Sequence, residues 1–584
     1  MKQTNAQYKG GIKMLGKCKI NDDGVLKGYI EHESELTVRI PDNVTVIGAR
    51  AFSDCTYIKR VVITKNVHVI EEEAFLNCSS LREVVIPDNI ECIGEAAFCG
   101  CTNLKSIVLP KKVDTINDST FMCCESLTEI NAENIKNVNG SAFDGCTNLR
   151  HIQFSTDLES LDADGLSFLD CINLESIDVI GSDITDDGFC SIDGALYHRD
   201  GDELELVVFP PAKKCITLPD NLTAIRGEAF FDSQIKSIFI PRYVKELNEC
   251  LNCCQDLEDI TVDPSNDSYS SFDGVLYNKE KTELLCCPKK KPAVSIFPST
   301  ATIAINAFFG CTEIKAINLK SVQKIEFKAF ADCISLEKIV FPEHLSYVAH
   351  SAFENTKWFE ERRQNDEVVT ASNILIDASM AGKGSGTVIV PEGITDISPY
   401  CFENNNNVKE VILPNSIKHI GGMAFSDCIQ LENIDLCNVE TLGDALFYQC
   451  YSLKEITLPN PVKEIDKYTF FTAKSLSEIN VDENNEHFSS VNGMLFSKDK
   501  KTLLVIPEAK KDVTIPDGTM FISKTAISSK IRRLTTPESI DIDSLSELFE
   551  SLSTLIDLSD LIVHCFGNKV KSICEKHDII YEMI

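Results

Sequence analysis

Positive charge is scarce in this sequence of 584 residues. Lysine and arginine number 56 against 89 aspartates and glutamates, which leaves a formal net charge of −33. An acidic surface of this kind repels phosphate backbones and anionic lipid head groups. Nucleic acid and bare membrane are therefore poor candidate partners. The charge leaves a basic protein, a cation or a neutral glycan as candidates.

Long apolar runs are also missing. No run reaches the length of about 18 apolar residues that a membrane-spanning helix needs, so we expect no such helix. Residues 1–21 contain lysines but no apolar core of a secretory signal, and the C-terminal residues do not resemble a lipid anchor. This pattern favours a cytoplasmic protein.

The motifs of common catalytic sites are absent. The 10 histidines are scattered, and the sequence has no H-E-x-x-H, no P-loop, no G-x-S-x-G and no G-x-G-x-x-G after a strand. The Asp/Asn-rich stretches at 263–267 and 482–485 lack the order of an EF-hand and are interpreted as solvated turns. We therefore expect no enzyme activity and no cofactor.

An internal repeat of 22 to 25 residues dominates the chain. Three successive copies are VTVIGARAFSDCTYIKRVVITKN (44–66), VHVIEEEAFLNCSSLREVVIPDN (67–89) and IECIGEAAFCGCTNLKSIVLPKK (90–112). Such a regular period predicts a stack in which each repeat covers the core of its neighbours. The phenylalanine position recurs in 15 repeats, at Phe52, Phe75, Phe98, Phe121, Phe143, Phe168, Phe230, Leu251, Phe308, Phe330, Phe353, Phe402, Phe425, Phe447 and Phe470.

The spacing within one repeat predicts a short strand and an opposite wall. In L-x-x-I-x-L the apolar residues alternate with polar ones, which is typical of a strand with one buried face. A proline often follows, as at Pro87 and Pro110, and ends the pairing because it has no N–H to donate. The Ala-Phe pair is expected to fill the opposite wall. Stacked repeats then form a parallel sheet along the whole solenoid.

Cysteine is abundant, with 25 residues, and most of it follows the repeat. Because identical positions in a row offer no defined pairs for disulfides, we predict buried structural thiols that satisfy backbone groups. A zinc site at Cys250-x-x-Cys253 is the alternative, but Cys250 takes the alanine position of the repeat, so we expect no metal. The thiol lies three residues after the phenylalanine in 11 of the 15 repeats, at Cys55, Cys78, Cys101, Cys124, Cys146, Cys171, Cys254, Cys311, Cys333, Cys428 and Cys450.

The motif A-F-x-x-C-x-x-L-x-x-I-x-L-P resembles the leucine-rich repeats of the Treponema pallidum type, found in BspA-like proteins (the Bacteroides surface protein A family). The resemblance covers roughly residues 20–584. It implies a leucine-rich-repeat solenoid with a right-handed superhelix, rich in short parallel strands and poor in helices. It also implies adhesion or protein binding without enzyme activity, and an address at the cell surface or outside the cell.

A second element interrupts the repeats at 189–210, 269–288 and 488–507, with a degenerate copy at 371–391 and a related opening at 20–41. Each consists of two apolar stretches around a charged turn, so we predict β-hairpin inserts. Pairs such as Asp193-Gly194 supply tight turns. These inserts either begin new blocks of repeats or project as extra contact ridges.

The inserts divide the chain into blocks. We predict an N-terminal segment and hairpin cap over 1–43 and repeat blocks over 44–187, 214–268, 293–355 and 391–486. Hairpin inserts are expected over 188–213, 269–292 and 487–511, a helix plus hairpin insert over 356–390, and a terminal coil with a C-terminal cap over 512–584.

Two helical segments are expected to cover open ends of the stack. Over 357–365, Trp358, the single tryptophan, and Phe359 are predicted to cover the preceding coil, a role that we favour over ligand binding. In the cap, Ser544-x-x-Glu547 predicts a capping box, and 561–584 predicts strand, helix, strand. The cap helix is expected to bury one apolar stripe, formed by Leu545, Leu548, Phe549, Leu552 and Leu555.

The side chains that flank the buried isoleucine of each strand should point outward and offer a binding surface. Val62, Val85 and Val108 are expected to form an apolar stripe, which marks a contact site unless β-branched residues are there only because they suit strands. We predict a monomeric, non-catalytic scaffold for a protein or glycan partner, with a surface adhesin as the alternative. The candidate partner-binding residues are Val62, Val85, Val108, Glu83, Phe239 and Ile412.

Overall fold

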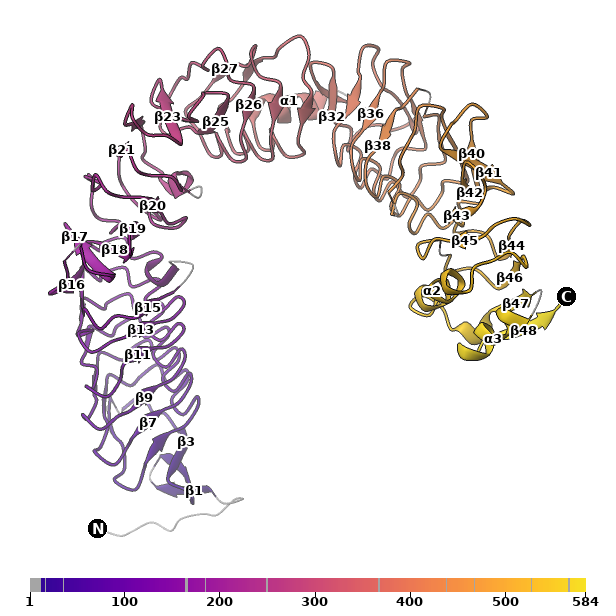
Figure 1. The fold of residues 1–584 in the computed structure, drawn as a ribbon. Helices are drawn as coiled ribbons and strands as arrows, with labels where there is room; N and C mark the ends of the chain where they lie inside the picture. Colours follow the sequence, from indigo (N-terminus) through magenta and orange to yellow (C-terminus); the bar gives the residue numbers. More distant parts are fainter. Residues whose placement is uncertain are drawn as a thin grey trace. The chain divides into compact units, whose positions relative to one another are not determined.

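The protein is described from a computed structural model. It describes residues 12–584 apart from 16, 35, 163–165, 184, 248–249, 366–367, 437, 467, 527 and 566–567. The chain divides into two compact units, unit 1 (Met1–Phe297) and unit 2 (Pro298–Ile584). Each unit is a stack of coils with short strands, as the ribbon shows (Figure 1).

Each regular coil contributes strands to two separate parallel sheets. The L-x-x-I-x-L segments form what we call the face strands, and the V-x-x-I segments form shorter back strands, usually of two residues. The predicted parallel face strands are thus confirmed, but they form several short sheets instead of one sheet along the whole solenoid. The back sheet was not predicted, because a two-residue strand is too short to show alternation of apolar and polar residues.

The strands of unit 1 are of three kinds. Its face strands are β4 (Thr37–Arg39), β6 (Arg60–Val62), β8 (Glu83–Val85), β10 (Ser106–Ile107), β12 (Glu129–Ile130), β14 (His151–Ser155), β16 (Ser176–Ile180), β21 (Ser237–Ile240) and β22 (Asp259–Val262). Its back strands are β5 (Val46–Ile47), β7 (Val69–Ile70), β9 (Cys92–Ile93), β11 (Thr115–Ile116), β13 (Asn137–Val138), β15 (Ser160–Leu161) and β20 (Ala224–Ile225). Antiparallel groups are β1 (Ile12–Leu15), β2 (Cys18–Asn21) and β3 (Val25–Tyr29); β17 (Gly188–Ile192), β18 (Ala195–Asp200) and β19 (Glu203–Val208); and β23 (Tyr269–Phe272), β24 (Val275–Asn278) and β25 (Glu283–Cys286).

Unit 2 contains the same three kinds of strand. Its face strands are β27 (Ala316–Asn318), β29 (Lys338–Val340), β33 (Thr387–Ile389), β35 (Glu410–Ile412), β37 (Asn433–Ile434), β39 (Glu455–Leu458), β40 (Glu478–Val481), β44 (Asp512–Thr514), β46 (Arg533–Thr536), β47 (Ile562–Cys565) and β48 (Ile580–Met583). Its back strands are β26 (Thr302–Ile303), β28 (Lys324–Ile325), β30 (Tyr347–Val348), β34 (Asp396–Ile397), β36 (His419–Ile420), β38 (Thr441–Leu442) and β45 (Phe521–Ile522). Antiparallel groups are β31 (Val369–Ala371) with β32 (Ile374–Asp377), and β41 (Phe488–Val491), β42 (Met494–Ser497) and β43 (Thr502–Val505).

The interior of each stack is lined by a column of phenylalanine rings. Phe75 lies parallel to Phe52 at 4.9 Å and to Phe98 at 5.2 Å between ring centroids, and all three rings are fully buried. Offset stacking of this kind adds to the free energy gained by burying the rings. The Ala-Phe pair therefore fills the wall that the sequence predicted.

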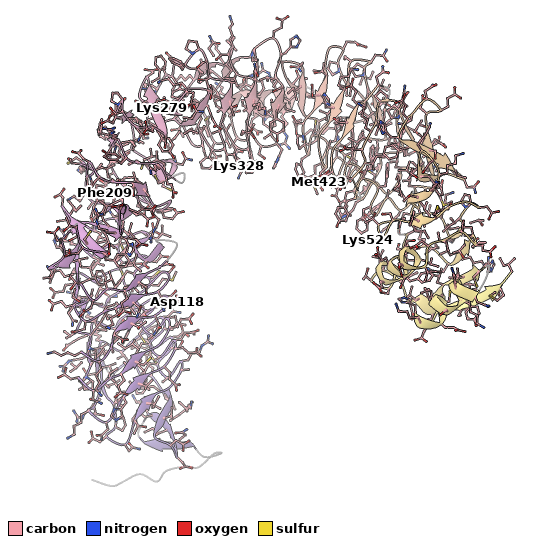
Figure 2. All side chains as sticks on the ribbon, in the orientation of Figure 1. Asp118, Phe209, Lys279, Lys328, Met423 and Lys524 are labelled. Atoms are coloured by element: carbon pink, nitrogen blue, oxygen red, sulfur yellow. The ribbon has the colours of Figure 1, made fainter. Side chains whose placement is uncertain are left out.

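The chain turns sharply on both sides of the Ala-Phe pair. The residue before the alanine and the second residue after the phenylalanine have left-handed backbones, as at Glu73 (φ 52°) and Asn77 (φ 58°) in one coil. In unit 2, Lys328 and Met423 hold the first of these positions, with φ of 52° and 54° (Figure 2). Asn, Asp and Gly recur at the second position because they adopt this conformation at low cost.

The cysteine ladder connects successive coils. Cys78 Sγ donates to the carbonyl oxygen of Phe52 at 3.1 Å, and Cys101 Sγ donates to that of Phe75 at 3.2 Å. Every described cysteine is a free thiol. The predicted role is confirmed at these two thiols, since each satisfies a buried backbone carbonyl. The same bond recurs at Cys124, Cys146, Cys171, Cys333, Cys428 and Cys450.

The inserts differ from the predicted two-stranded hairpins. Around 188–208, 269–286 and 488–505 the chain forms three antiparallel strands, because the segment before the Asp-Gly or Asn-Gly turn also pairs. In the segments 20–41 and 371–391 the last apolar stretch does not fold back. It forms β4 and β33, which pair in parallel with the face strands β6 and β35.

The helices lie at coil ends, as expected. Helix α1 (Lys357–Asn365) buries Trp358 against Phe353 and Phe341, with ring centroids 5.1 and 5.4 Å away. In the cap, α2 (Ile542–Leu552), β47, α3 (Asn568–Lys576) and β48 confirm a helix followed by strand, helix, strand. Short 3-10 turns occupy Leu166–Phe168, Cys250–Cys253 and Leu558–Asp560. None of the helices within the described ranges is long and apolar enough to cross a membrane.

The predicted capping box at Ser544 is wrong. Helix α2 begins two residues earlier, and the side chain of Asp541 accepts the N–H of Ser544 at 2.9 Å. Asp541 therefore caps the helix, since an aspartate in extended backbone can accept from the third helical N–H. Leu555 lies outside the helix and is 39% exposed, whereas the other four predicted apolar residues are buried.

Candidate binding face

The outward side chains of the face strands form two columns along each unit. In β6 the middle residue Val61 is fully buried, whereas Arg60 and Val62 on either side of it point away from the core. The register repeats this order from strand to strand, with Arg60 opposite Glu83 and Val62 opposite Val85. Equivalent outward residues therefore stand in rows across the strands, as predicted. We call this surface the binding face.

The predicted valine stripe lies in unit 1. Val85 is 38% exposed and Val108 is 71% exposed, whereas Val62 is half-buried. Val62 and Val85 are register partners, and Val108 directly follows β10, the next face strand, which lies against β8. The structure thus brings the three valines together, with less of Val62 accessible than expected.

The remaining candidate residues are spread along the face. Glu83 stands beside the stripe and forms an ion pair with Arg60, with 3.0 Å between Oε2 and Nε. Phe239 is 50% exposed on β21, further along unit 1. Ile412 is 46% exposed on β35 in unit 2. The six candidates are therefore not one patch.

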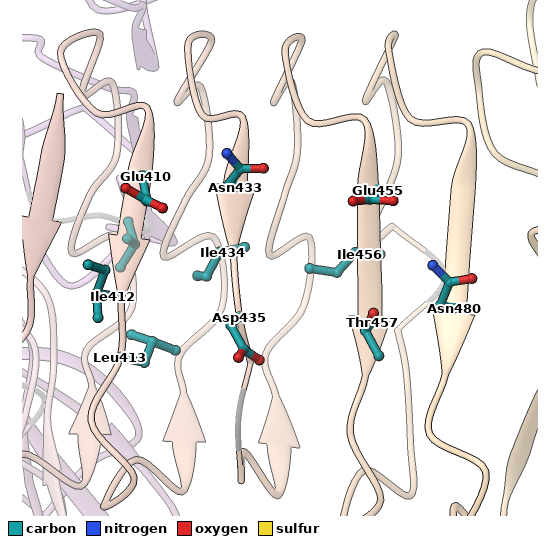
Figure 3. Close-up of a pocket in the computed structure, with 11 residues that line it drawn as sticks. Glu410, Ile412, Leu413, Asn433, Ile434, Asp435, Glu455, Ile456, Thr457 and Asn480 are labelled. Carbon is teal, nitrogen blue, oxygen red and sulfur yellow. The ribbon is translucent and has the colours of Figure 1, made fainter.

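A groove of about 540 Å³ opens on the binding face of unit 2. Glu410, Asn433 and Glu455 line it in one row, and Ile412, Asp435 and Thr457 stand in the neighbouring row (Figure 3). The buried residues Val411, Ile434 and Ile456 of the same strands lie beneath these rows. We call this surface the unit 2 groove.

The unit 2 groove lies at an interruption of the face sheet. Strands β33, β35 and β37 form one sheet and β39 and β40 another, so the ladder breaks between β37 and β39. Five positions separate Ile434 from Val439, but the same spacing separates Ile317 from Val322, where β27 and β29 still pair. The spacing therefore does not predict the break. The sequence pattern predicted that the outward side chains of these strands point away from the core, but of the groove residues only Ile412 was among the six candidate partner-binding residues.

Cys250 and Cys253 are the pair that the alternative zinc site would need. Cys250 is fully buried, and burial raises its pKa well above the ordinary value. Burial also raises the pKa of Cys253 to about 11, with Glu228 adding to the effect. Both thiols therefore keep their protons near neutral pH in the metal-free protein. Over the residues that the structure describes, no group of three or more His, Cys, Asp or Glu could hold a metal ion.

Parallel strands stacked coil on coil, a buried phenylalanine column and an open strand face define a leucine-rich-repeat solenoid. The model of the BspA type leucine rich repeat region, with six copies, matches residues 31–134, 68–191, 212–283, 286–373 and 382–501. These ranges cover most of the chain, which therefore belongs to the BspA-type leucine-rich-repeat family.

Among curated proteins no match to this chain is found. Among solved structures, the chain is similar to a leucine rich cell surface protein of Faecalibacterium prausnitzii, with 23% identity over 74% of this chain and 95% of the other and a TM-score of 0.31. It is also similar to a leucine-rich repeat protein of Bacteroides ovatus, with 17% identity over 83% and 99% and a TM-score of 0.29. The leucine rich repeat protein of T. pallidum shows 22% identity over 37% and 90%, with a TM-score of 0.19.

Proposed function

We propose that this protein is a non-catalytic scaffold that binds a protein or glycan partner through its binding face. The observation that carries the proposal is the alternation within the face strands. One residue of each strand supports the core, while its neighbours on both sides stay open in rows from coil to coil. Such a regular open surface suits extended contact with a partner.

In unit 1 the valine stripe is the proposed contact. Val85 and Val108 expose apolar surface next to each other on the otherwise polar face, and burying apolar surface favours association. Phe239 would add a large apolar contact further along, because half of its side chain is accessible. The family also supports a binding role, since its repeat builds scaffold surfaces and no catalytic motif accompanies it.

The first test replaces Val62, Val85 and Val108 together by glutamate. The variant should lose capture of a partner from an extract of the native host, because three carboxylates would have to be desolvated on binding. Thermal unfolding should stay cooperative, since Val85 and Val108 are exposed and Val62 is only half-buried.

A matched control carries the same charges elsewhere. Ile172, Ile334 and Ile429 are exposed apolar residues that lie off the face strands, and their replacement by glutamate should leave capture intact. Equal recovery of the partner by both triple variants would place the contact outside the valine stripe and overturn this assignment.

A further inference from the structure

The unit 2 groove has a composition that selects one kind of partner. This inference rests on the proposed function, since it concerns another stretch of the same binding face. Three carboxylates line the groove, those of Glu410, Asp435 and Glu455, and no lysine or arginine is found among its lining residues in the described part of the chain.

The carboxylates of Glu410 and Glu455 differ from that of Glu83 on the face of unit 1. There, Glu83 is neutralised by Arg60 of the preceding strand at 3.0 Å. Within the described ranges, Glu410 accepts a hydrogen bond from the Thr387 hydroxyl at 3.2 Å, but neither it nor Glu455 forms an ion pair. No cation among the described lining residues of the groove offsets their negative charge, on a chain that is acidic overall.

A pair of exposed apolar side chains lies next to the groove. Ile389 and Ile412 are register partners on β33 and β35, and they are 66% and 46% exposed. Ile412 also lines the groove, so one continuous surface runs from an aliphatic pair to a row of acidic and polar side chains. A partner would bury an apolar side chain on the isoleucines and place positive charge on the carboxylates.

The outward residues here favour a polypeptide over a sugar. Glycan sites commonly stack sugar rings on aromatic side chains, and none of the outward positions on β33, β35, β37, β39 and β40 is aromatic. Glu410 and Glu455 stand two strands apart, which is roughly 10 Å at the usual spacing between strands and more where the ladder is interrupted. About three or more residues of an extended chain span that distance.

We infer that the unit 2 groove binds a basic, extended segment of a protein partner, with an aliphatic side chain on Ile389 and Ile412 and lysines or arginines on Glu410 and Glu455. The segment would carry its basic residues about three or more positions apart. Charge complementarity decides the occupant, because an acidic or neutral segment would form no ion pairs with Glu410 and Glu455.

The probe is a short fluorescent peptide with one leucine followed by lysines at every third position in a glycine–serine background. A second peptide has glutamate in place of lysine. Fluorescence anisotropy with the full chain should show binding of the lysine peptide alone, and the affinity should fall as salt rises, because exposed ion pairs are screened.

Charge removal at the groove is compared with equal charge removal elsewhere. The double variant Glu410→Gln, Glu455→Gln should weaken peptide binding about tenfold, since two ion pairs are lost. The matched variant Glu464→Gln, Glu538→Gln changes two exposed carboxylates off the groove and should change affinity by no more than about twofold. This comparison separates docking in the groove from general attraction to an acidic protein.

Replacing Ile389 and Ile412 by serine provides an independent readout. It should weaken binding of the lysine peptide while leaving the slope of affinity against salt unchanged, because apolar burial carries no charge. Unfolding curves of all variants confirm that each protein is folded.

Two outcomes would overturn the inference. One is equal weakening of peptide binding by the groove variant and the matched variant, and the other is a lysine peptide that binds no better than its glutamate counterpart. The valine-to-glutamate variant of unit 1 should retain peptide binding. If the valine-to-glutamate variant still captured the partner while the groove variant still weakened peptide binding, only the valine contact would be contradicted. The two proposals can therefore fail independently of each other.

Discussion

A buried thiol in the cysteine ladder acts as a hydrogen-bond donor only while it keeps its proton. Cys428 donates to the carbonyl oxygen of Phe402 at 3.1 Å, and burial raises its pKa from an ordinary value of 9.0 to about 12. The same environment that makes the thiol useful for stacking makes it a poor nucleophile and a poor metal ligand.

This pKa predicts how stability depends on pH. In the unfolded chain the thiol ionises near pH 9, whereas in the folded chain it stays protonated up to about pH 12. The folded state then binds more protons, so the free energy of unfolding is unaffected below about pH 9 and falls between pH 9 and 12. One such thiol contributes a slope on the order of 1 kcal/mol per pH unit.

Urea unfolding at several values between pH 8 and 11 measures that slope. Cys428→Ala should lower stability at pH 8 and make the fall at higher pH shallower by the contribution of one thiol. The exposed residue Cys215, replaced in the same way, should leave the slope as it is. A slope that Cys428→Ala does not change would contradict a protonated, buried thiol.

At the scale of elements, the three-stranded inserts attach to the solenoid through tight turns. Gly194 lies between β17 and β18 with φ of 72°, and its carbonyl accepts the N–H of Ile177 in the face strand β16 at 2.8 Å. A Cβ atom at Gly194 would lie 2.7 Å from the Cβ of Ser176. The glycine is thus needed both for its backbone and for close contact.

The insert offers a matched pair of glycines to separate these two causes. Gly201, in the next turn, also has a left-handed backbone, with φ of 58°, but a Cβ atom there would meet no described atom within 4 Å. Gly201→Ala should cost about 1 kcal/mol of stability from the backbone alone. Gly194→Ala should cost roughly 2 to 3 kcal/mol, because Ser176 must also shift.

Chemical unfolding of the two variants decides the point. Equal costs would mean that the contact between the insert and β16 relaxes freely and that only the turn geometry matters.

At the scale of the whole molecule, the net charge of −33 sets the response to salt. Like charges repel along the stack, whereas the surface ion pairs, such as Lys112–Glu91 at 2.6 Å, join side chains more than half exposed and contribute little. Screening therefore removes more repulsion than attraction. We expect the melting temperature to rise by a few degrees between about 0.01 and 0.3 M salt.

Thermal melts across a sodium chloride series measure this effect. A melting temperature that falls with added salt would show that the ion pairs outweigh the excess of negative charge.

The sequence by itself determined the repeat, the face strands and the thiol ladder, because each of these depends on one short pattern repeated in every coil. The positions of Phe75, Cys78 and the alternating residues around Val84 are set within one repeat. Stacking of successive repeats then aligns equivalent residues in columns, and no contact between distant segments is needed. The helix at Trp358 and the order of the C-terminal cap were predictable for the same reason, since apolar spacing indicates them directly.

Only the tertiary structure decided which strands of neighbouring coils pair and where this pairing stops. The back strands, the third strand of the three-stranded inserts and the cap at Asp541 depend on contact with a partner segment, which the composition of a segment does not reveal. The unit 2 groove arises where β37 and β39 fail to form a ladder, and the six candidate residues separate because Phe239 and Ile412 lie on other strands than the valines. A binding surface on a solenoid is a property of several coils together, whereas the sequence pattern describes one coil at a time.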